Sequence, residues 1–184
     1  KDLPDDDQAY VLNCLPEDRS QEVLKLMKPE DSAEVKGLLQ YEPKTAGAIM
    51  TTEYFSLPEH TTAEEAIHKL QGAKDTGNVF YVYVTDKDDK LVGVLSLRQL
   101  LQVSPQTRLG IMIKRDVISV ATDTDQEEVA KLVGRYNLLA IPVVDRDSTL
   151  VGIITVDDVV DIIHDAATED MLKMSGTQIE EEDE

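Results

Sequence analysis

An internal repeat constrains the fold of this 184-residue chain more than any other feature of its sequence. The hydrophobic segment Leu91–Ser96 reads LVGVLS and matches Leu150–Thr155, which reads LVGIIT. Upstream of these segments, residues 62–66 (TAEEA) correspond to residues 124–129 (TDQEEV). Two copies of one pattern predict two similar modules that pack together rather than one unrepeated core.

Each copy predicts the same order of elements. Short runs rich in Val, Ile and Leu indicate strands, and apolar residues at helical spacing indicate helices. In the first copy we expect an extended segment at 54–57, a helix at 63–71, two strands at 79–85 and 91–96, and a closing helix at 97–101. In the second copy we expect an extended segment at 117–120, a helix at 125–136, two strands at 140–144 and 150–155, and a closing helix at 157–167. The repeat is therefore β-α-β-β-α, and the fold class is α+β.

The first 42 residues follow a different pattern. A proline followed by acidic residues recurs at residues 4–6, 16–18 and 29–31. Proline suits the first turn of a helix, and acidic side chains in that turn interact favourably with the helix dipole. We therefore expect short helices that form a partial all-α helical-repeat domain ahead of the two modules.

The charge of the chain excludes several classes of function. Thirty-seven Asp and Glu residues against 18 Lys and Arg residues give a formal net charge of −19. Nucleic acid and anionic membrane surfaces repel such a chain, because both bind clustered Lys and Arg. Carboxylate oxygens are the ligands that Mg²⁺ prefers, although solubility alone is the simpler explanation of an acidic surface.

The sequence contains no recognisable catalytic motif. Nothing in it supplies a nucleophile with a base and an orienting group, and His60, His68 and His164 have no partner at metal-ligand spacing. We therefore expect the chain not to be an enzyme. No apolar run reaches the roughly 18 residues that a membrane span needs. The single cysteine, Cys14, excludes an intramolecular disulfide, and its apolar neighbours predict a small core residue.

The β-α-β-β-α order, with a glycine, two hydrophobic residues and a Ser or Thr leading into the closing helix, resembles the cystathionine-β-synthase (CBS) domain over residues 45–167. Five further segments resemble MgtE-type magnesium transporters: residues 45–51 (TAGAIMT), 94–98 (VLSLR), 122–128 (TDTDQEE), 155–159 (TVDDV) and 167–170 (ATED). The resemblance divides the chain into part of a helical N domain (1–42), a first CBS domain (43–106), a second CBS domain (107–167) and the start of a connector with an acidic tail (168–184).

The resemblance implies a cytosolic regulatory domain that senses intracellular Mg²⁺ and gates a transmembrane pore. In the family, a connecting helix and a membrane domain follow, and this chain stops short of both. Because it also begins at Lys1 without a Met, we expect it to be part of a longer protein on the cytoplasmic side of the cell membrane. CBS pairs generally dimerise through their helices, so a homodimer is expected.

Acidic residues are the candidate metal ligands. Asp158 and Asp161 share one face of a helix at three-residue spacing, where two like charges repel unless a cation lies between them. For Asp125 and Glu127 a structural role is the simpler explanation, because a capping box formed by Thr124 and Glu127 would also account for acidic residues at the start of that helix. By motif, the resemblance assigns Mg²⁺ ligands to Asp125, Glu127, Asp158, Asp161, Glu169 and Asp170, with Asp2 and Asp6 on the helical side. Ala166 stands where the family has an acid.

Adenine nucleotide binding is the alternative function, because nucleotides are the commonest ligands of CBS domains. Their sites use a Ser/Thr-x-x-Asp step, which the second copy has at Thr155 and Asp158 and the first replaces with Ser96 and Gln99. For ATP or another adenine nucleotide, the remaining candidate contacts are Arg98, Tyr81 and Leu138. A stand-alone interaction protein with a merely soluble acidic surface is the third alternative.

Overall fold

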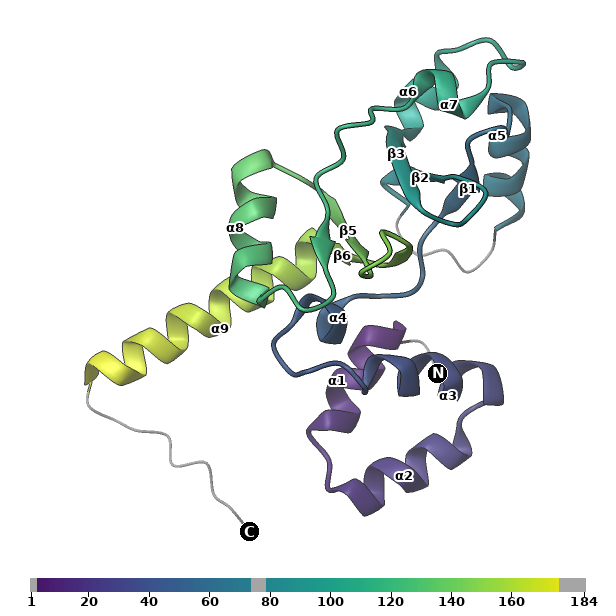
Figure 1. Cartoon of the computed structure of the whole chain (residues 1–184). Helices are drawn as coiled ribbons and strands as arrows, with labels where there is room; N and C mark the ends of the chain where they lie inside the picture. The colour runs from purple at the N-terminus through teal and green to yellow at the C-terminus, as the bar shows by residue number, and fades with distance from the viewer. Residues whose placement is uncertain (1–2, 74–78, 176–184) are drawn as a thin grey trace.

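Two three-stranded β-sheets form the frame of the molecule (Figure 1). The computed structural model describes residues 3–73 and 79–175, without the side chains of residues 169–170 and 172–175. In each sheet the first strand runs parallel to the second, which pairs antiparallel with the third. The strands are β1 (Ser56–Pro58), β2 (Tyr81–Thr85) and β3 (Leu91–Ser96) in the first sheet, and β4 (Val120–Ala121), β5 (Ala140–Val144) and β6 (Leu150–Thr155) in the second.

Helices complete each module and build the N-terminal region. The described N-terminal region consists of the three helices α1, α2 and α3, and a helix follows the first and the third strand of each sheet. This order confirms the predicted β-α-β-β-α modules and the helical N-terminal part. The helices are α1 (Asp5–Asn13), α2 (Glu17–Leu26), α3 (Pro29–Leu38), α4 (Ala46–Ile49), α5 (Ala63–Gly72), α6 (Leu97–Leu101), α7 (Leu109–Met112), α8 (Gln126–Tyr136) and α9 (Val156–Ser175). Each of α1, α2 and α3 begins at or directly after a proline, as the recurring motif predicts.

The short helices α4 and α7 are exchanged between the modules. The segment of α4 precedes the first module but lies on the second, where the Ala46 N–H donates to the Thr124 carbonyl at 2.7 Å. The segment of α7 precedes the second module but lies on the first, where the Leu109 N–H donates to the Thr61 carbonyl at 2.9 Å. The two modules are therefore linked by an exchange of chain as well as by packing.

This exchange explains the glycine in each repeat. A Cβ built on Gly93 of β3 would lie 2.5 Å from the Ile113 side chain that follows α7. A Cβ on Gly152 of β6 would lie 2.6 Å from the sulfur of Met50, which follows α4. Only glycine lets the exchanged segments approach the strands so closely.

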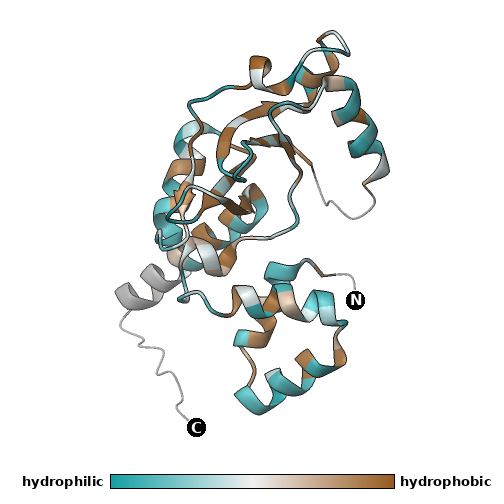
Figure 2. Cartoon of the chain, turned by 45° about the vertical axis from the view of Figure 1, so that its right-hand side comes forward, coloured by the Kyte–Doolittle hydropathy of each residue, from teal (hydrophilic) through white to brown (hydrophobic). Residues whose placement is uncertain are grey.

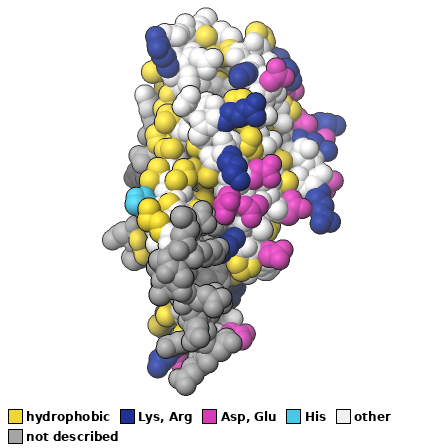
Figure 3. All heavy atoms as spheres, turned by 90° about the vertical axis from the view of Figure 1, so that its left-hand side faces the viewer, with side chains coloured by type: hydrophobic (Ala, Val, Ile, Leu, Met, Phe, Trp, Pro, Cys, Tyr) yellow, Lys and Arg dark blue, Asp and Glu magenta, His cyan; other side chains and the backbone are white. Residues whose placement is uncertain are grey.

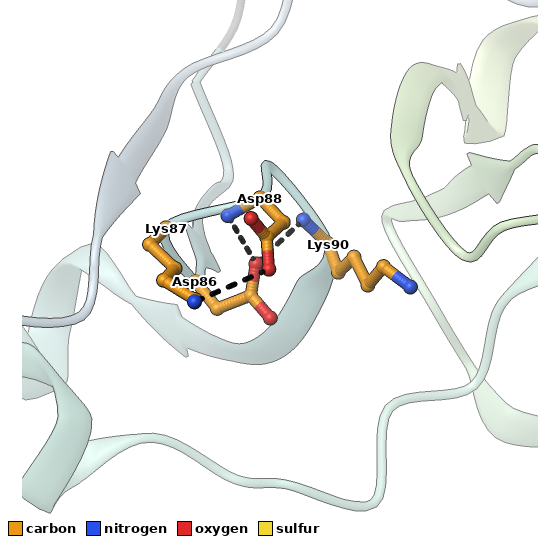
Figure 4. Close-up of polar contacts among 4 residues, drawn as sticks. All are labelled: Asp86, Lys87, Asp88 and Lys90. Atoms are coloured by element: carbon orange, nitrogen blue, oxygen red, sulfur yellow. Dashed lines mark hydrogen bonds and ion pairs between the residues drawn. The ribbon is translucent and has the colours of Figure 1, made fainter.

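Matching turns join the two sheets. The Asp86 carboxylate accepts hydrogen bonds from the backbone N–H groups of Asp88 at 2.8 Å and Lys90 at 3.0 Å, so the loop between β2 and β3 is closed by its own side chain (Figure 4). The corresponding turn of the second module is built in the same way. The Leu91 N–H then donates to the Ser148 carbonyl at 3.0 Å, which ties one turn to the other.

The hydrophobic core is continuous from the N-terminal helices into the second module. Buried side chains of α1, α2 and α3 belong to the same cluster as those of α4, α8, β5 and the first half of α9, while the first module has its own cluster. Figure 2 shows hydrophobic residues on the strands and on parts of the helices in this region. The N-terminal domain (α1–α3) therefore docks on the pair of modules chiefly through α4.

Three local predictions are wrong. Cys14 is exposed at the end of α1. Asp125, not Thr124, is the N-cap of α8, because its carboxylate accepts from the Glu127 N–H at 2.8 Å while the Thr124 hydroxyl accepts from the Ala121 N–H at 3.1 Å. The last helix was expected to end at residue 167 and continues to Ser175.

Within the described part of the chain, none of the helices combines the length and the apolar character that a membrane span requires.

Two tyrosines between the sheets are predicted to respond oppositely to loss of the hydroxyl group. The Tyr83 hydroxyl is buried without a hydrogen-bond partner among the described residues, whereas the Tyr54 hydroxyl donates to the Leu150 carbonyl at 2.9 Å. Removing an unsatisfied buried group relieves a desolvation cost, so Tyr83→Phe should raise the free energy of unfolding by about 1 kcal/mol. Tyr54→Phe should lower it by a similar amount. Urea denaturation measures both, and a loss of stability in Tyr83→Phe would contradict the packing described.

Candidate functional site

Acidic side chains meet where the first turn of α1 lies near the start of α9. Asp5 and Asp6 are buried, with 4% and 9% of their surface exposed, and Asp7 beside them is exposed. Asp158, in the first turn of α9, is half-buried. Buried carboxylates are rare unless they are paired with hydrogen-bond donors or with cations, so each requires an explanation.

Asp5 is explained by hydrogen bonds to the chain that enters the first module. One carboxylate oxygen accepts from the Thr51 hydroxyl at 2.5 Å, and the other accepts from the Thr52 N–H at 2.9 Å and from the Thr52 hydroxyl. The Asp6 N–H also donates to Asp5, at 3.0 Å. Asp5 is therefore a fully bonded buried carboxylate.

Asp6 has no such set of donors. Its Oδ1 atom is buried and has no hydrogen-bond partner within the described residues. Burial first, and then the negative charge of Asp158, raise the pKa of Asp6 from 3.8 to about 7. A hydrogen bond from the Asp7 backbone opposes this rise, and the charges of Asp5 and Asp7 add smaller contributions to it. The ionised form of Asp6 is thus disfavoured unless a cation lies beside it.

Asp158 lies on the other side of this junction. It caps its own helix, because its carboxylate accepts from the Thr155 hydroxyl at 2.5 Å and from the Thr155 N–H at 3.3 Å, as the Thr155-x-x-Asp158 spacing predicts. Burial raises the pKa of Asp158, the bonds to Thr155 oppose that rise, and the charges of Asp157 and Asp7 add to it. Both of these hydrogen bonds use Oδ2, so the helix cap engages only one of the two oxygens of Asp158.

The structure brings together only part of the predicted set of metal ligands. Asp125 and Glu127 are exposed at the start of α8, where Asp125 caps the helix and Glu127 pairs with Lys131 at 3.9 Å. Asp161 is exposed on α9. The side chains of Glu169 and Asp170, and all of Asp2, lie outside the described residues.

The junction fits a hydrated divalent cation better than a dry metal cage. Among residues 3–73 and 79–168, no three His, Cys, Asp or Glu side chains form a group that could hold a metal ion. Mg²⁺ keeps several of its waters and needs only one or two carboxylates from the protein. Asp6, with an oxygen that has no partner among the described residues, and Asp158, with a raised pKa, are the candidates for such a pair.

A separate pocket lies between the first sheet and the second module. Its volume is about 220 Å³, and Tyr81, Ser96, Gln99 and Leu138 are among the side chains that line it. The Gln99 side-chain oxygen accepts from the Ser96 N–H at 2.8 Å and from the Ser96 hydroxyl at 3.0 Å, which leaves its amide N–H groups as donors. Of the residues predicted for a nucleotide, Arg98 is exposed outside this lining, and Asp158 faces the N-terminal helices.

Sequence reasoning missed Asp5 and its partners Thr51 and Thr52. Three successive acids after a proline look alike in the sequence, and each fits the helix dipole. It also missed Glu34 of α3, an exposed residue whose pKa is raised by partial desolvation and then by the charge of Asp5. No signal in the sequence separates these residues, because their surroundings depend on how α1 docks.

Known protein families match nearly the whole chain. The family model of the CBS domain matches residues 46–105 and 110–165, and that of the MgtE intracellular N domain matches residues 1–44. The magnesium transporter MgtE of Thermus thermophilus is 43% identical over 160 residues, which cover 86% of this chain and 36% of that protein. The chain thus spans little more than a third of the length of this curated relative.

Two solved structures are similar over most of the chain. The soluble part of a magnesium transporter is 41% identical with a TM-score of 0.86, and the match covers 90% of this chain and 65% of that one. The cytosolic domain of the Mg²⁺ channel MgtE in complex with ATP is 42% identical with a TM-score of 0.84, covering 87% and 66%.

Replacing Asp6 with asparagine should stabilise the protein in a pH-dependent way. Because the pKa of Asp6 is higher in the folded state, ionisation opposes folding as the pH rises from about 4 to about 7, and the penalty is constant above that. Asp6→Asn should therefore raise the free energy of unfolding by up to about 4 kcal/mol at pH 8 and leave it nearly unchanged below pH 4. Thermal unfolding without divalent cations measures this, and Asp18→Asn on α2 is the exposed control. An equal effect at both pH values would contradict the assignment.

Proposed function

The chain belongs to the CBS-domain family and carries part of an MgtE intracellular N domain ahead of its two CBS domains, and from this premise we propose that it is the cytosolic regulatory domain of a magnesium transporter. In this role it lies on the cytoplasmic side of the cell membrane and senses intracellular Mg²⁺ through carboxylates at domain interfaces. Its own transmembrane domain, gated in response, belongs to the full-length protein.

The observation that carries the proposal is the buried oxygen of Asp6, for which the described residues provide no hydrogen-bond partner. Asp6 on the N-terminal domain and Asp158 on the second CBS domain repel each other when both are ionised. A bound Mg²⁺ supplies the positive charge that lets both carboxylates stay ionised and close. Asp6 and Asp158 then hold α1 and α9 together in a compact state. Mg²⁺ favours this state over one in which the two domains are apart only to the extent that it binds the compact state more tightly.

The remaining acids of the predicted set belong to the same proposal. Asp161 and Asp125 with Glu127 are exposed, so cation sites there need a second element, such as the connecting helix or a second copy of the chain. Glu169, Asp170 and Asp2 complete the set that the family resemblance assigns.

We further propose a homodimer formed through the CBS domains. Large apolar side chains of the second module are exposed: Val160 (51%), Ile163 (52%) and Met171 (72%) on α9, with Tyr136 at the end of α8 and Leu139 shortly after it (46% each). Figure 3 shows hydrophobic side chains gathered beside acidic ones on the side of the molecule formed by α8 and α9. An apolar surface next to charge is typical of a protein interface, and a second copy supplies a matching surface.

Adenine nucleotide binding is the second candidate function. The pocket lined by Tyr81, Gln99 and Leu138 supports it, because apolar walls with a few polar groups at one end are typical of small-ligand sites. The similar cytosolic domain solved in complex with ATP favours the same ligand class. An acid in place of Gln99 would accept bonds from ribose hydroxyls, which the amide N–H groups that remain here cannot do.

Mg²⁺ should compact the protein more than Na⁺ at the same ionic strength. General screening depends only on ionic strength, with a Debye length of about 8 Å near physiological salt, so it acts equally in matched solutions. Ligation by Asp6 and Asp158 requires a divalent cation between the two carboxylates, so it does not act equally in the two solutions. Small-angle X-ray scattering should show a smaller radius of gyration in Mg²⁺, and Asp158→Asn should weaken this response while Asp18→Asn leaves it intact. Equal compaction by matched Na⁺ would mean that the acidic surface serves only solubility.

Replacing Gln99 with aspartate should tighten ATP binding by about tenfold, or about 1.4 kcal/mol. An aspartate at this position keeps the cap on Ser96, as Asp158 does for Thr155, and leaves a second oxygen for ribose hydroxyls. Isothermal titration calorimetry measures the change, and Gln102→Asp just after α6 is the matched control. Tight ATP binding whose affinity does not change in Gln99→Asp would mean that the nucleotide binds outside this pocket.

A further inference from the structure

Asp5 differs from the acids around it because its carboxylate has no free acceptor position. An ionised carboxylate offers about four lone-pair positions. In Asp5, Oδ1 accepts from the Thr51 hydroxyl and the Asp6 N–H, and Oδ2 accepts from the Thr52 N–H and the Thr52 hydroxyl. Nothing remains on Asp5 with which to ligate a cation.

The donors that surround Asp5 show that it is not an ordinary helix cap. Apart from the N–H of the next residue, every donor comes from Thr51 or Thr52, more than 40 residues away and in a different domain. The N-cap position of α1 is Pro4, which makes no side-chain cap. The bonds of Asp5 therefore hold one domain to another rather than closing a helix.

Thr51 is also hydrogen-bonded to the second CBS domain. Its N–H donates to the Ile153 carbonyl at 2.9 Å, and the Ile153 N–H donates back to the Thr51 carbonyl at 3.0 Å. Ile153 lies in β6, and two residues later Thr155 is capped by Asp158. Asp5 is thus connected through Thr51 to β6, the strand that leads directly into α9, on which Asp158 lies.

Attraction and repulsion therefore act on neighbouring residues of α1. Asp5 binds the pair of CBS domains, whereas Asp6 has a buried oxygen without a hydrogen-bond partner among the described residues, and its carboxylate and that of Asp158 repel each other when both are ionised. Hydrogen bonds to an ionised group are roughly twice as strong as those between neutral groups, which suits Asp5 to oppose the repulsion next to it.

We propose that Asp5 is a positioning residue that holds α1 docked through Thr51 and Thr52, and so keeps Asp6 and Asp158 close enough to share a divalent cation. The metal part of this inference rests on the proposed function, and the docking part does not. Asp5 itself never touches the cation.

The proposal predicts opposite effects for two neighbouring substitutions. Asp5→Asn replaces an acceptor with an amide group that faces the two donors of Thr52, so the N-terminal domain should loosen. Asp6→Asn removes the repelled charge, so docking should tighten. Thr51→Val, which keeps the shape of the side chain and removes its hydroxyl, should act like Asp5→Asn.

Distances measured between two spin labels test docking directly. One label goes on Cys14, which is exposed at the end of α1, and the other on Gly134→Cys, an exposed position on α8 with open space around it. Labelled protein is diluted with unlabelled protein, so that distances arise within one chain. Without Mg²⁺, the distance distribution should broaden to longer values in Asp5→Asn and Thr51→Val, and narrow in Asp6→Asn. Glu17→Gln, which follows the proline that precedes α2, should leave it unchanged.

A Mg²⁺ titration of the same samples completes the test. The concentration at half response should rise about tenfold in Asp5→Asn, because the cation must also bring the domains together. Asp5→Asn that stays folded by circular dichroism and keeps the original distance would overturn the proposal, as would a lower melting temperature without a change in distance. If the unmodified chain ignores Mg²⁺, the proposed function fails, while the metal-free distances still decide the role of Asp5.

Discussion

The arrangement of the domains depends on the burial of two adjacent carboxylates in the first turn of α1. Asp5 receives a complete set of donors from Thr51, Thr52 and the Asp6 N–H, whereas one oxygen of Asp6 has no hydrogen-bond partner in the described part of the chain. One residue therefore stabilises the junction between the N-terminal domain and the CBS pair, and the next one strains it. The proposed sensitivity of this junction to cations follows from Asp6, which is disfavoured as an anion and has one buried oxygen without a hydrogen-bond partner among the described residues.

The exchange of α4 and α7 explains why this junction matters to the whole molecule. The N-terminal domain packs on α4, which lies on the second CBS domain, and the residues after α4 run through Thr51 into the first. Gly93 and Gly152 let the exchanged segments lie against the strands. The N-terminal domain is therefore connected to both CBS domains through packed chain rather than through a flexible linker.

Most of the fold could be predicted from the sequence, because its signals are local. The repeated segments fix two β-α-β-β-α modules, the recurring prolines fix the start of three helices, and the Thr155–Asp158 spacing fixes a cap. From the sequence, Asp6 is a candidate ligand only through the family resemblance. The role of Asp5, and its difference from Asp6, could not be predicted, because identical neighbours acquire different surroundings only when segments more than 40 residues apart come together. Spacing alone was also insufficient for Asp161, which shares the predicted face with Asp158 but is exposed.

The titration of the Asp6 side chain tests the central claim most directly. Carbon-13 NMR of the side-chain carboxyl groups follows Asp6 in the full chain, with Asp6→Asn to assign its signal. Without divalent cations the midpoint should lie near pH 7, and saturating Mg²⁺ should move it far downward, because a cation beside Asp6 favours the ionised form. A midpoint near the ordinary value of an aspartate, or one that Mg²⁺ does not move, would contradict the account.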